Sequence, residues 1–196
     1  MSAVLPNKRC LFRRKSDEIA LVAGSFDPIT VGHEWVLRQA LRRYKTVYLV
    51  GFINPDKKYL FWDEDRLRFL QRTADRYPGV IADQNSGYLA DYCREKGITV
   101  VVKGYRSKKD YDYELSMAEE NNRRNPALRT LLLLSPRRLR KVSSTRVRET
   151  LIAGGSLKGF VPAACRGAVA HTYTDFYASS PYFHPEDYLG DSSRNN

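Results

Sequence analysis

The sequence of 196 residues lacks long hydrophobic runs and paired cysteines. No apolar stretch approaches the ~20 residues that cross a bilayer, and the N-terminus has no apolar core of the kind that marks a secretory signal. Cys10, Cys93 and Cys165 lie far apart, without the spacing of a disulfide framework or a zinc site. We therefore expect a cytoplasmic protein with buried or idle thiols, no membrane partner and no protein-bound metal.

Positive charge, in contrast, is in excess. The chain has 33 Lys and Arg residues against 22 Asp and Glu residues, for a net charge of +11. A surplus of this size predicts an anionic partner. Nucleic acid, an anionic membrane surface and phosphorylated small molecules all carry the matching charge, so the position of the basic residues has to decide between them.

Five short apolar runs, most of them rich in β-branched residues, alternate with helix-like segments. The runs are residues 19–23, 46–52, 80–83, 99–103 and 130–134, and the segments between them are residues 34–44, 63–76, 88–96 and 110–124. Asp63 is placed as the N-cap of the second helix. The alternation predicts an α/β fold, a Rossmann-like doubly wound five-stranded parallel sheet with helices on both faces. Such sheets bind ligands beyond the carboxyl ends of their strands, where the strand order reverses.

The chain reads as one domain, residues 19–171, between two extensions. Residues 1–18 are basic and favour a disordered arm, with a short organellar presequence as the alternative. Residues 172–196 are rich in aromatic and turn residues and poor in helix signal. We expect this second extension to be an extended arm that packs on its own or a neighbouring subunit, with its last few residues loose.

The most informative motif, GSFDPITVGH, follows the first predicted strand at residues 24–33. Gly32 opens the next helix and His33 lies in its first turn, where unpaired N–H groups and the helix dipole favour an anion. The motif is neither the GxxxxGK[ST] phosphate loop nor GxGxxG. It resembles the HxGH/TxGH signature of the nucleotidylyltransferase superfamily, and in its longer form that of the phosphopantetheine adenylyltransferase family.

The resemblance implies roles for residues at the first three strand ends. His33 would contact the triphosphate of ATP near its α-phosphate, Ser25 would meet both substrates, and Phe26 would contact ATP through its backbone. Lys57, after the second strand, falls on the family's catalytic Lys, which reaches the transferring phosphate, and it would also bind the acceptor. Leu89, after the third strand, falls on a residue that lines the pantetheine site, although a core position in the next helix is an equally good interpretation.

Residues 103–106 (Lys-Gly-Tyr-Arg) follow the fourth predicted strand, where the family has Arg-Gly-Leu-Arg. The resemblance implies that Gly104, Tyr105 and Arg106 hold the nucleotide. It also implies that Lys103 is catalytic and binds the acceptor phosphate. Lys keeps the positive charge of the family's Arg but cannot make the two parallel hydrogen bonds that a guanidinium makes to a phosphate.

Two later blocks extend the resemblance. Glu114 corresponds to a carboxylate that contacts ATP, and Asn121 falls on a family Asn. Residues 142–148 (VSSTRVR) resemble the superfamily's second signature, Ile-Ser-Ser-Thr/Ser-x-x-Arg/Lys. The three residues that would hold the β- and γ-phosphates of ATP at a helix start are Ser143, Ser144 and Thr145. Leu139, flanked by basic residues, stands where the family often has an aromatic residue near the adenine.

The resemblance implies adenylyl transfer from ATP to 4′-phosphopantetheine, which gives dephospho-CoA and pyrophosphate by direct in-line attack without a covalent intermediate. Mg²⁺ would accompany ATP, held by phosphates and water rather than by a carboxylate cage. The resemblance also implies a homo-oligomer, typically a hexamer, and CoA as a feedback ligand.

Two alternatives stay open. Lys103 and Leu139 leave room for a nucleotidylyltransferase of the same superfamily with another phosphorylated acceptor. The net charge and the basic residues 137–141 leave room for a non-catalytic relative that binds nucleic acid, although no helix-turn-helix, zinc-finger or RNP pattern is present. The main basic clusters lie beyond the ends of predicted strands, which favours a pocket for ATP and a phosphorylated acceptor.

Overall fold

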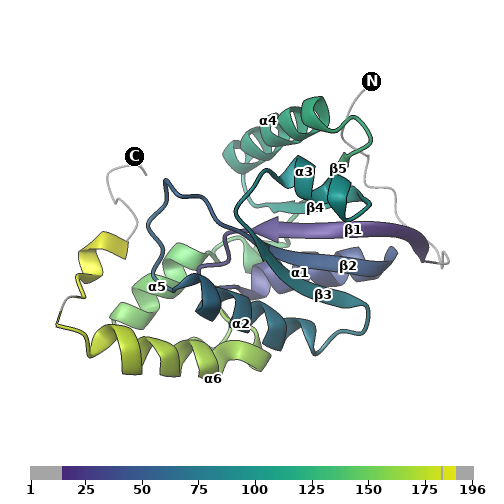
Figure 1. Ribbon diagram of the computed structural model, residues 1–196. Coiled ribbons are helices and arrows are strands. Elements are labelled where there is room, and N and C mark those ends of the chain that lie inside the picture. The colour runs from purple at the N-terminus through teal and green to yellow at the C-terminus, as the bar shows by residue number, and fades with distance from the viewer. Residues whose placement is uncertain (1–14, 182, 189–196) are drawn as a thin grey trace.

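A computed structural model describes residues 15–181 and 183–188 of the chain (Figure 1). Its five strands form one parallel sheet in the order β3-β2-β1-β4-β5. They are β1 (Ser16–Gly24), β2 (Tyr44–Phe52), β3 (Val80–Asn85), β4 (Ile98–Tyr105) and β5 (Arg129–Leu134). β2 and β3 extend the sheet from one edge of β1. The chain then returns and places β4, followed by β5, along the other edge of β1. The switch point therefore lies between β1 and β4, where a ligand site is expected.

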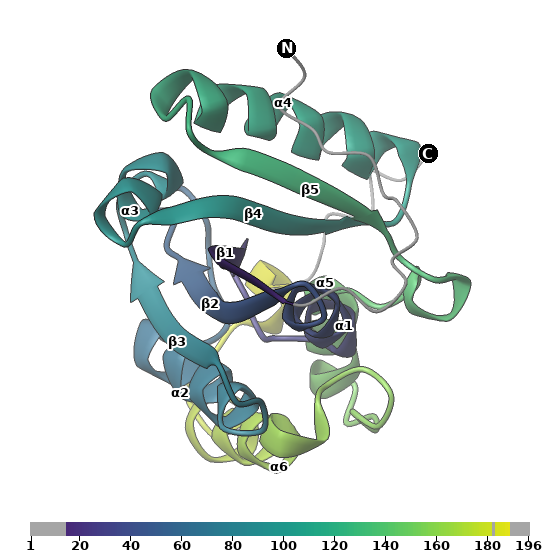
Figure 2. The same ribbon diagram turned by 90° about the vertical axis from the view of Figure 1, so that its right-hand side faces the viewer.

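Helices cover both faces of this sheet (Figures 1 and 2). One face carries α1 (Val31–Leu41), α2 (Asp63–Ala74), α5 (Ser144–Ile152) and α6 (Ala163–Thr172). The other carries α3 (Leu89–Glu95) and α4 (Lys108–Arg124). The predicted doubly wound α/β architecture is thus confirmed.

The core consists of two apolar layers that share the central strand. Ala20 and Val22 of β1 belong to the layer beneath α1, and Leu21 and Ala23 belong to the layer beneath α3. Side chains alternate between the faces of a strand, so a strand buried on both sides reads as the continuous apolar run seen in the sequence.

The N-terminal parts of two elements differ from expectation. β1 begins at Ser16, inside the segment assigned to the basic arm, because it pairs with the start of β2. Residues 1–14, which make up most of that arm, lie outside the described residues. The N-cap of α2 is Trp62, not Asp63, and its side chain makes no capping hydrogen bond. Asp63 is the first helical residue, where its carboxylate pairs with Arg66 one turn later and faces the positive end of the helix dipole.

The C-terminal extension is helical where an extended arm was expected. α6 continues through Thr172 into a π-helix, Tyr173–Ala178, and a short 3₁₀ turn follows at Pro185–Tyr188. Tyr173 and Tyr177 lie four residues apart on one helix face, so both rings enter the core of this chain. The prediction of an extended conformation is therefore wrong for these residues, whereas packing on the chain itself is confirmed. Residues 182 and 189–196 lie outside the described part.

Cys93 and Cys165 are buried and free, as expected. Burial raises the pKa of the Cys93 thiol to about 12 and that of Cys165 to about 11, so both stay protonated. Cys10 lies outside the described residues. Within the described residues, no helix combines the length and the apolarity needed to cross a membrane.

Candidate active site

Two adjoining cavities open at the carboxyl ends of the strands, at the switch point. The larger cavity has a volume of about 830 Å³. It is lined by residues of β1, β2 and β4, of the loop after β2 and of one face of α4. The smaller, of about 490 Å³, extends from α1 to the start of α5. Residues that line both include His33, Gly104 and Glu114. The two cavities therefore form one site with two arms.

His33 is held by a reciprocal capping arrangement at the start of α1. Thr30 is the N-cap, and its hydroxyl accepts a hydrogen bond from the His33 backbone N–H at 3.3 Å. The Thr30 backbone N–H donates in return to His33 Nδ1 at 3.1 Å. A backbone N–H can only donate, so Nδ1 is unprotonated and the proton of the neutral ring sits on Nε2.

The electrostatic surroundings keep this imidazole neutral. Its burial, together with the positive charges of Lys103 and Arg106, lowers the pKa of His33 to about 3. The edge of the Phe26 ring packs against it, with 4.9 Å between the ring centroids. His33 therefore presents a neutral Nε2–H donor at the junction of the two arms.

A second helix start faces the smaller arm. Ser143 is the N-cap of α5 and accepts a hydrogen bond from the Arg146 backbone N–H. The Ser144 hydroxyl donates to the carbonyl of Pro28, at 2.9 Å, which ties this helix start to the loop after β1. Both residues and Thr145 line the smaller arm opposite His33. Two helix N-termini thus meet at one cavity, an arrangement that favours an anion with several charges.

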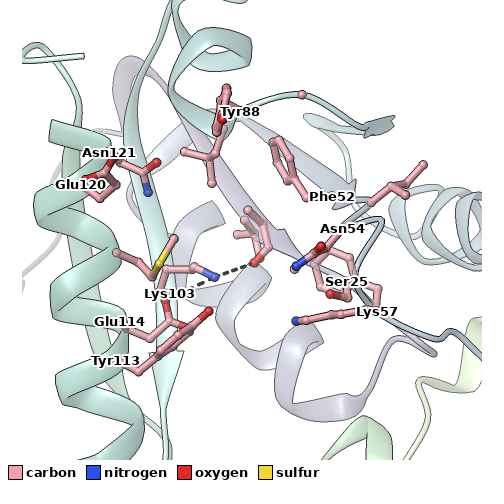
Figure 3. A pocket seen from close by; sticks show the side chains of 18 of the residues that line it. Ser25, Phe52, Asn54, Lys57, Tyr88, Lys103, Tyr113, Glu114, Glu120 and Asn121 are labelled. Atoms are coloured by element: carbon pink, nitrogen blue, oxygen red, sulfur yellow. Dashed lines mark hydrogen bonds and ion pairs between the residues drawn. The ribbon is translucent and has the colours of Figure 1, made fainter. Parts of the chain in front are cut away.

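Two lysines point into the larger arm from opposite sides (Figure 3). Lys103, on β4, donates to the carbonyl of Ala23 at 3.1 Å and pairs with the Glu114 carboxylate at 3.3 Å. Lys57 stands on the exposed loop after β2, and the described residues offer no hydrogen-bond or ion-pair partner for its ammonium. Of the two lysines, Lys103 is therefore already paired, whereas Lys57 is free to meet a ligand.

Arg106 connects β4 to the smaller arm, whereas Tyr105 turns away from it. The Arg106 guanidinium donates to Asp110, at 3.0 Å, and to the carbonyl of Val142, at 3.1 Å. The Tyr105 ring packs edge-on against Tyr111 and lines neither cavity. The structure thus brings the Arg106 side chain to the site but not that of Tyr105.

Gly104 and Phe26 lie where backbone comes close to the site. A Cβ on Gly104 would lie 2.7 Å from Val36 Cγ2, so only glycine allows β4 to approach α1 this closely. Phe26 has a φ of 49°, in the left-handed region that few non-glycine residues adopt. Its ring is buried, so its backbone is the part available to a ligand.

The remaining predicted residues also line the cavities. Ser25 lines the larger arm, while its carbonyl accepts a hydrogen bond from Arg66 at 2.7 Å. Leu89 begins α3, lines the larger arm and packs on the core beneath it. Leu139 lies in the 3₁₀ turn Arg137–Leu139 and lines the smaller arm.

Sequence reasoning missed one wall of the larger arm. The face of α4 contributes six residues with helical spacing: Tyr113, Glu114, Met117, Glu120, Asn121 and Arg124. Only Glu114 and Asn121 were singled out. The intervals of three and four residues were a signal that could have identified the others. The Arg124 guanidinium packs over the ring of Tyr88, at 4.0 Å from the ring centroid.

Asp27, also missed, is a buried carboxylate beside the site. It accepts hydrogen bonds from the backbone N–H groups of Leu60 and Phe61, at 2.9 and 3.0 Å. Burial raises the pKa of Asp27, while those hydrogen bonds and the charge of Arg148, 3.4 Å away, act against the rise. The motif at residues 24–33 contains Asp27 but does not show its role, because its partners lie more than 30 residues away.

The described residues contain no group of three or more His, Cys, Asp or Glu side chains that could hold a metal ion. Glu114, at the junction of the arms, is already paired with Lys103. The donors present at the site are N–H groups, hydroxyls and cations. This set matches the oxygens of phosphate groups rather than a bare cation.

Comparison with known proteins gives relatives that span most of the chain. Residues 21–150 match the family model described as cytidylyltransferase-like. The phosphopantetheine adenylyltransferase of Clostridium tetani (strain Massachusetts / E88) is 37% identical over 144 residues, which cover 74% of this chain and 90% of the relative. That of Clostridium novyi (strain NT) is 33% identical over 144 residues, covering 74% and 89%. That of Desulfatibacillum aliphaticivorans is 34% identical over 146 residues, covering 74% and 83%.

A solved structure shows the same fold. The chain of "Plasmodium falciparum nicotinic acid mononucleotide adenylyltransferase complexed with APC" superposes with a TM-score of 0.60 and 15% sequence identity. The match covers 84% of this chain and all of that one. At this identity the likeness concerns the architecture alone.

Proposed function

Because this chain belongs to the phosphopantetheine adenylyltransferase family, we propose that it transfers the adenylyl group of ATP to the phosphate of 4′-phosphopantetheine. The products are dephospho-CoA and pyrophosphate. The observation that carries this proposal is the two-armed site, with two helix starts on one arm and two lysines on the other. Its arms offer separate places for a polyphosphate and for a phosphorylated acceptor.

The reaction needs no general base. An oxygen of the acceptor phosphate, already anionic at neutral pH, attacks the α-phosphorus of ATP. The bond from that phosphorus to the bridging oxygen breaks, and pyrophosphate leaves with the electron pair. Catalysis then depends on holding the two anions in line, which supplies up to about 7–11 kcal/mol. A single donor aimed at the developing charge adds about 3–4 kcal/mol.

Three side chains act on the reacting phosphates in this proposal. The Nε2–H of His33 donates to an α-phosphate oxygen, which suits a ring kept neutral with its proton on that nitrogen. Lys57, without a partner among the described residues, reaches the transferring phosphate. Lys103, oriented by Glu114 and the Ala23 carbonyl, binds the acceptor phosphate.

The nucleotide occupies the smaller arm and its junction with the larger one. The helix start at Ser143, Ser144 and Thr145 holds the β- and γ-phosphates, and Arg106 adds positive charge beside them. The backbones of Phe26 and Gly104 contact the nucleoside part, with Leu139 near the base. Ser25 and Leu89 face the acceptor in the larger arm. Glu114 lies where it reaches both substrates.

Some properties follow from the family resemblance only. Mg²⁺ enters as part of the substrate, on the phosphates of ATP. The chain forms a homo-oligomer, a hexamer in the family pattern, and CoA competes for the acceptor arm as a feedback ligand. The reaction takes place in the cytoplasm.

A second candidate is transfer to another phosphorylated acceptor, favoured by Lys103 in place of the family's Arg and by Leu139. Pyrophosphate release is measured with 4′-phosphopantetheine, nicotinamide mononucleotide and glycerol 3-phosphate, each with MgATP. We expect release with phosphopantetheine only. Release with one of the other acceptors alone would refute the first choice. Salt-sensitive binding to an unrelated DNA duplex without any pyrophosphate release would instead favour a nucleic-acid-binding relative.

A further inference from the structure

The loop between β2 and α2, residues 53–62, carries Lys57 at the tip of an arc. The arc is closed where the Asn54 backbone N–H donates to the Tyr59 hydroxyl, at 2.8 Å. The Tyr59 ring in turn lies under the buried guanidinium of Arg66, 3.8 Å from the ring centroid. Lys57 itself is exposed and its ammonium has no partner among the described residues. The position of that ammonium therefore depends on what holds the base of the arc.

Three consecutive backbone N–H groups fix this base. Leu60 and Phe61 donate to the Asp27 carboxylate. The next residue, Trp62, donates to the hydroxyl of Tyr177 at 2.8 Å. Trp62 is also the N-cap of α2, which has no side-chain cap of its own, so Tyr177 supplies the contact at the point where the loop becomes helix.

Tyr177 is well placed to hold this point rigidly. Its hydroxyl donates onward to the Asp65 carboxylate at 3.1 Å, which orients the oxygen that accepts from Trp62. Its ring is buried and packs edge-on against Phe61, with 5.4 Å between centroids. Burial raises the pKa of the Tyr177 phenol, so the group stays protonated and can donate and accept at once.

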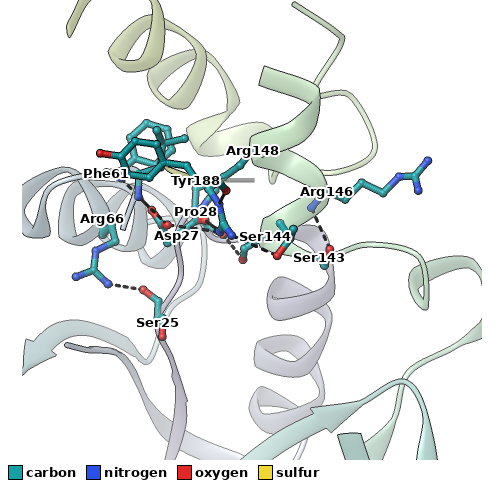
Figure 4. A network of polar contacts seen from close by, with 12 residues as sticks. Ser25, Asp27, Pro28, Phe61, Arg66, Ser143, Ser144, Arg146, Arg148 and Tyr188 are labelled. Carbon is teal, nitrogen blue, oxygen red and sulfur yellow. Dashed lines mark hydrogen bonds and ion pairs between the residues drawn. The ribbon is translucent and has the colours of Figure 1, made fainter. Parts of the chain in front are cut away.

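The segment that bears Tyr177 is also tied to the phosphate-binding helix start (Figure 4). Arg148, on α5, donates to the carbonyl of Tyr188 at 2.9 Å and to the carbonyl of Asp27 at 2.8 Å. It also donates to the Thr145 hydroxyl at 3.3 Å. The nucleotide arm, Asp27 and the C-terminal segment thus share one partly buried network. The ion pair of Lys58 and Asp187, in which both side chains are exposed, contributes little by comparison.

We propose that Tyr177 is a positioning residue for adenylyl transfer: it fixes the base of the loop that carries Lys57. The inference rests on the proposed function. It assigns a role to the C-terminal segment, which lies outside the sequence motifs of the nucleotidylyltransferase superfamily. The motif residues build the two arms, and this segment sets where one of the cations meets the transferring phosphate.

The test is the kinetics of Tyr177→Phe, which keeps the ring in the core and removes both hydrogen bonds. Because Lys57 acts on the transition state, its displacement acts on kcat, for which we expect a loss of about tenfold. The KM values for ATP and for phosphopantetheine should stay within about twofold of wild type, because the groups that hold both ground states do not move.

A double-mutant cycle with Lys57→Ala separates positioning from general destabilisation. If Tyr177 acts through Lys57, Tyr177→Phe lowers kcat in the wild-type background and has no further effect once Lys57 is absent. An equal loss in both backgrounds overturns the proposal. A wild-type kcat in Tyr177→Phe overturns it as well. If Tyr177→Phe does not fold, Asp65→Ala replaces it in the same cycle, because that change removes the acceptor of the Tyr177 proton and leaves the ring in place.

Tyr173→Phe is the matched control. Tyr173 lies in the same π-helix, its ring is buried, and its hydroxyl has no hydrogen-bond partner among the described residues. We expect wild-type kinetics from this variant, and a tenfold loss of kcat here would show that any change in the segment lowers activity. Wild-type protein that releases no pyrophosphate with phosphopantetheine would refute the proposed function itself. Activity in wild type together with unchanged kinetics in Tyr177→Phe would refute only the role of Tyr177.

Discussion

At the scale of single residues, His33 combines two roles in one side chain. The hydrogen bond that it accepts from the Thr30 backbone caps α1 and at the same time leaves the proton on Nε2. Glutamate at the same helix position makes the reciprocal cap as well, but its carboxylate has no N–H to donate. Capping and donation to a phosphate can therefore be separated by substitution.

We expect both His33→Ala and His33→Glu to lower kcat at least about 100-fold, because a donor to the charge on the α-phosphate is lost. His33→Glu should retain the wild-type melting temperature within a few degrees, since the capping box remains. Steady-state kinetics with MgATP and phosphopantetheine and a circular-dichroism melt measure the two effects. A near-wild-type kcat in His33→Ala and His33→Glu contradicts the catalytic role.

The lowered pKa of His33 also predicts how stability depends on pH. The unfolded chain takes up a proton at this residue below about pH 6.5, its ordinary value, whereas the folded chain does so only near 3. His33 therefore contributes stability that is fully present above pH 6.5 and is lost progressively as the pH falls towards 3. Between pH 7 and 5, the wild-type free energy of unfolding should fall more than that of His33→Gln, as measured by urea unfolding. Parallel pH profiles would contradict the neutral, buried state of the ring.

At the scale of elements, the helix starts can be tested against each other. Ser143 caps α5 and Ser107 caps α4, each by accepting a hydrogen bond at 3.1 Å from the backbone N–H three residues later. Ser143 lines the smaller arm, whereas Ser107 lines neither arm. The pair therefore matches in capping and differs in access to the ligand.

Both Ser143→Ala and Ser107→Ala should lower the free energy of unfolding by about 1 kcal/mol. Only Ser143→Ala should raise the KM for ATP, by about 3- to 10-fold, because one phosphate contact of about 1 kcal/mol is lost. Urea unfolding and ATP saturation curves measure the two effects. An equal rise of KM in both variants would show that the helix start at Ser143 has no special part in binding.

The elements themselves could be predicted because their signals are local. Each predicted strand overlaps an observed one, and the acidic start of α2 is visible in the sequence even though Asp63 is not its cap. The same is true of the site residues that directly follow strands, such as Ser25 and Arg106. Tyr105 shows the limit of this reasoning, since neighbours in one motif point in different directions at the end of a strand.

The residues that brace the site could not be predicted in this way. Asp27 and Tyr177 act through contacts with a loop 33 and 115 residues away in sequence. The residues after Thr172 have a low intrinsic helix propensity, so their sequence resembles that of turns and loops. The helix there is stabilised by the burial of its aromatic rings instead. Long-range packing therefore decided the conformation of the C-terminal extension.

At the scale of the whole molecule, two sets of basic residues lie at or beside the site. Five basic residues line the two arms: Lys57, Lys103, Arg106, Lys109 and Arg124. Arg138 and Lys141 are exposed beside the smaller arm without lining it. The first set matches a pocket for ATP and a phosphorylated acceptor. The second set stays outside the pocket and can attract anions towards its mouth.

We expect the 22.6-kDa chain to sediment as a hexamer, the assembly implied by its family. Sedimentation equilibrium at micromolar concentration gives the mass directly, without a shape assumption. A single species at the mass of the monomer would contradict this prediction.

The contact between Trp62 and Tyr177 also has a consequence for the timing of biosynthesis. The two residues lie 115 positions apart, so a ribosome that adds about 5–20 residues per second needs roughly 6–23 s to travel from one to the other. During that interval the nascent chain already contains the motif residues from Ser25 to Leu89, and later those of α4 and α5. The loop with Lys57 nevertheless waits for its last anchor. The contact that fixes the base of this loop thus forms only after the residues that bind the substrates have been made.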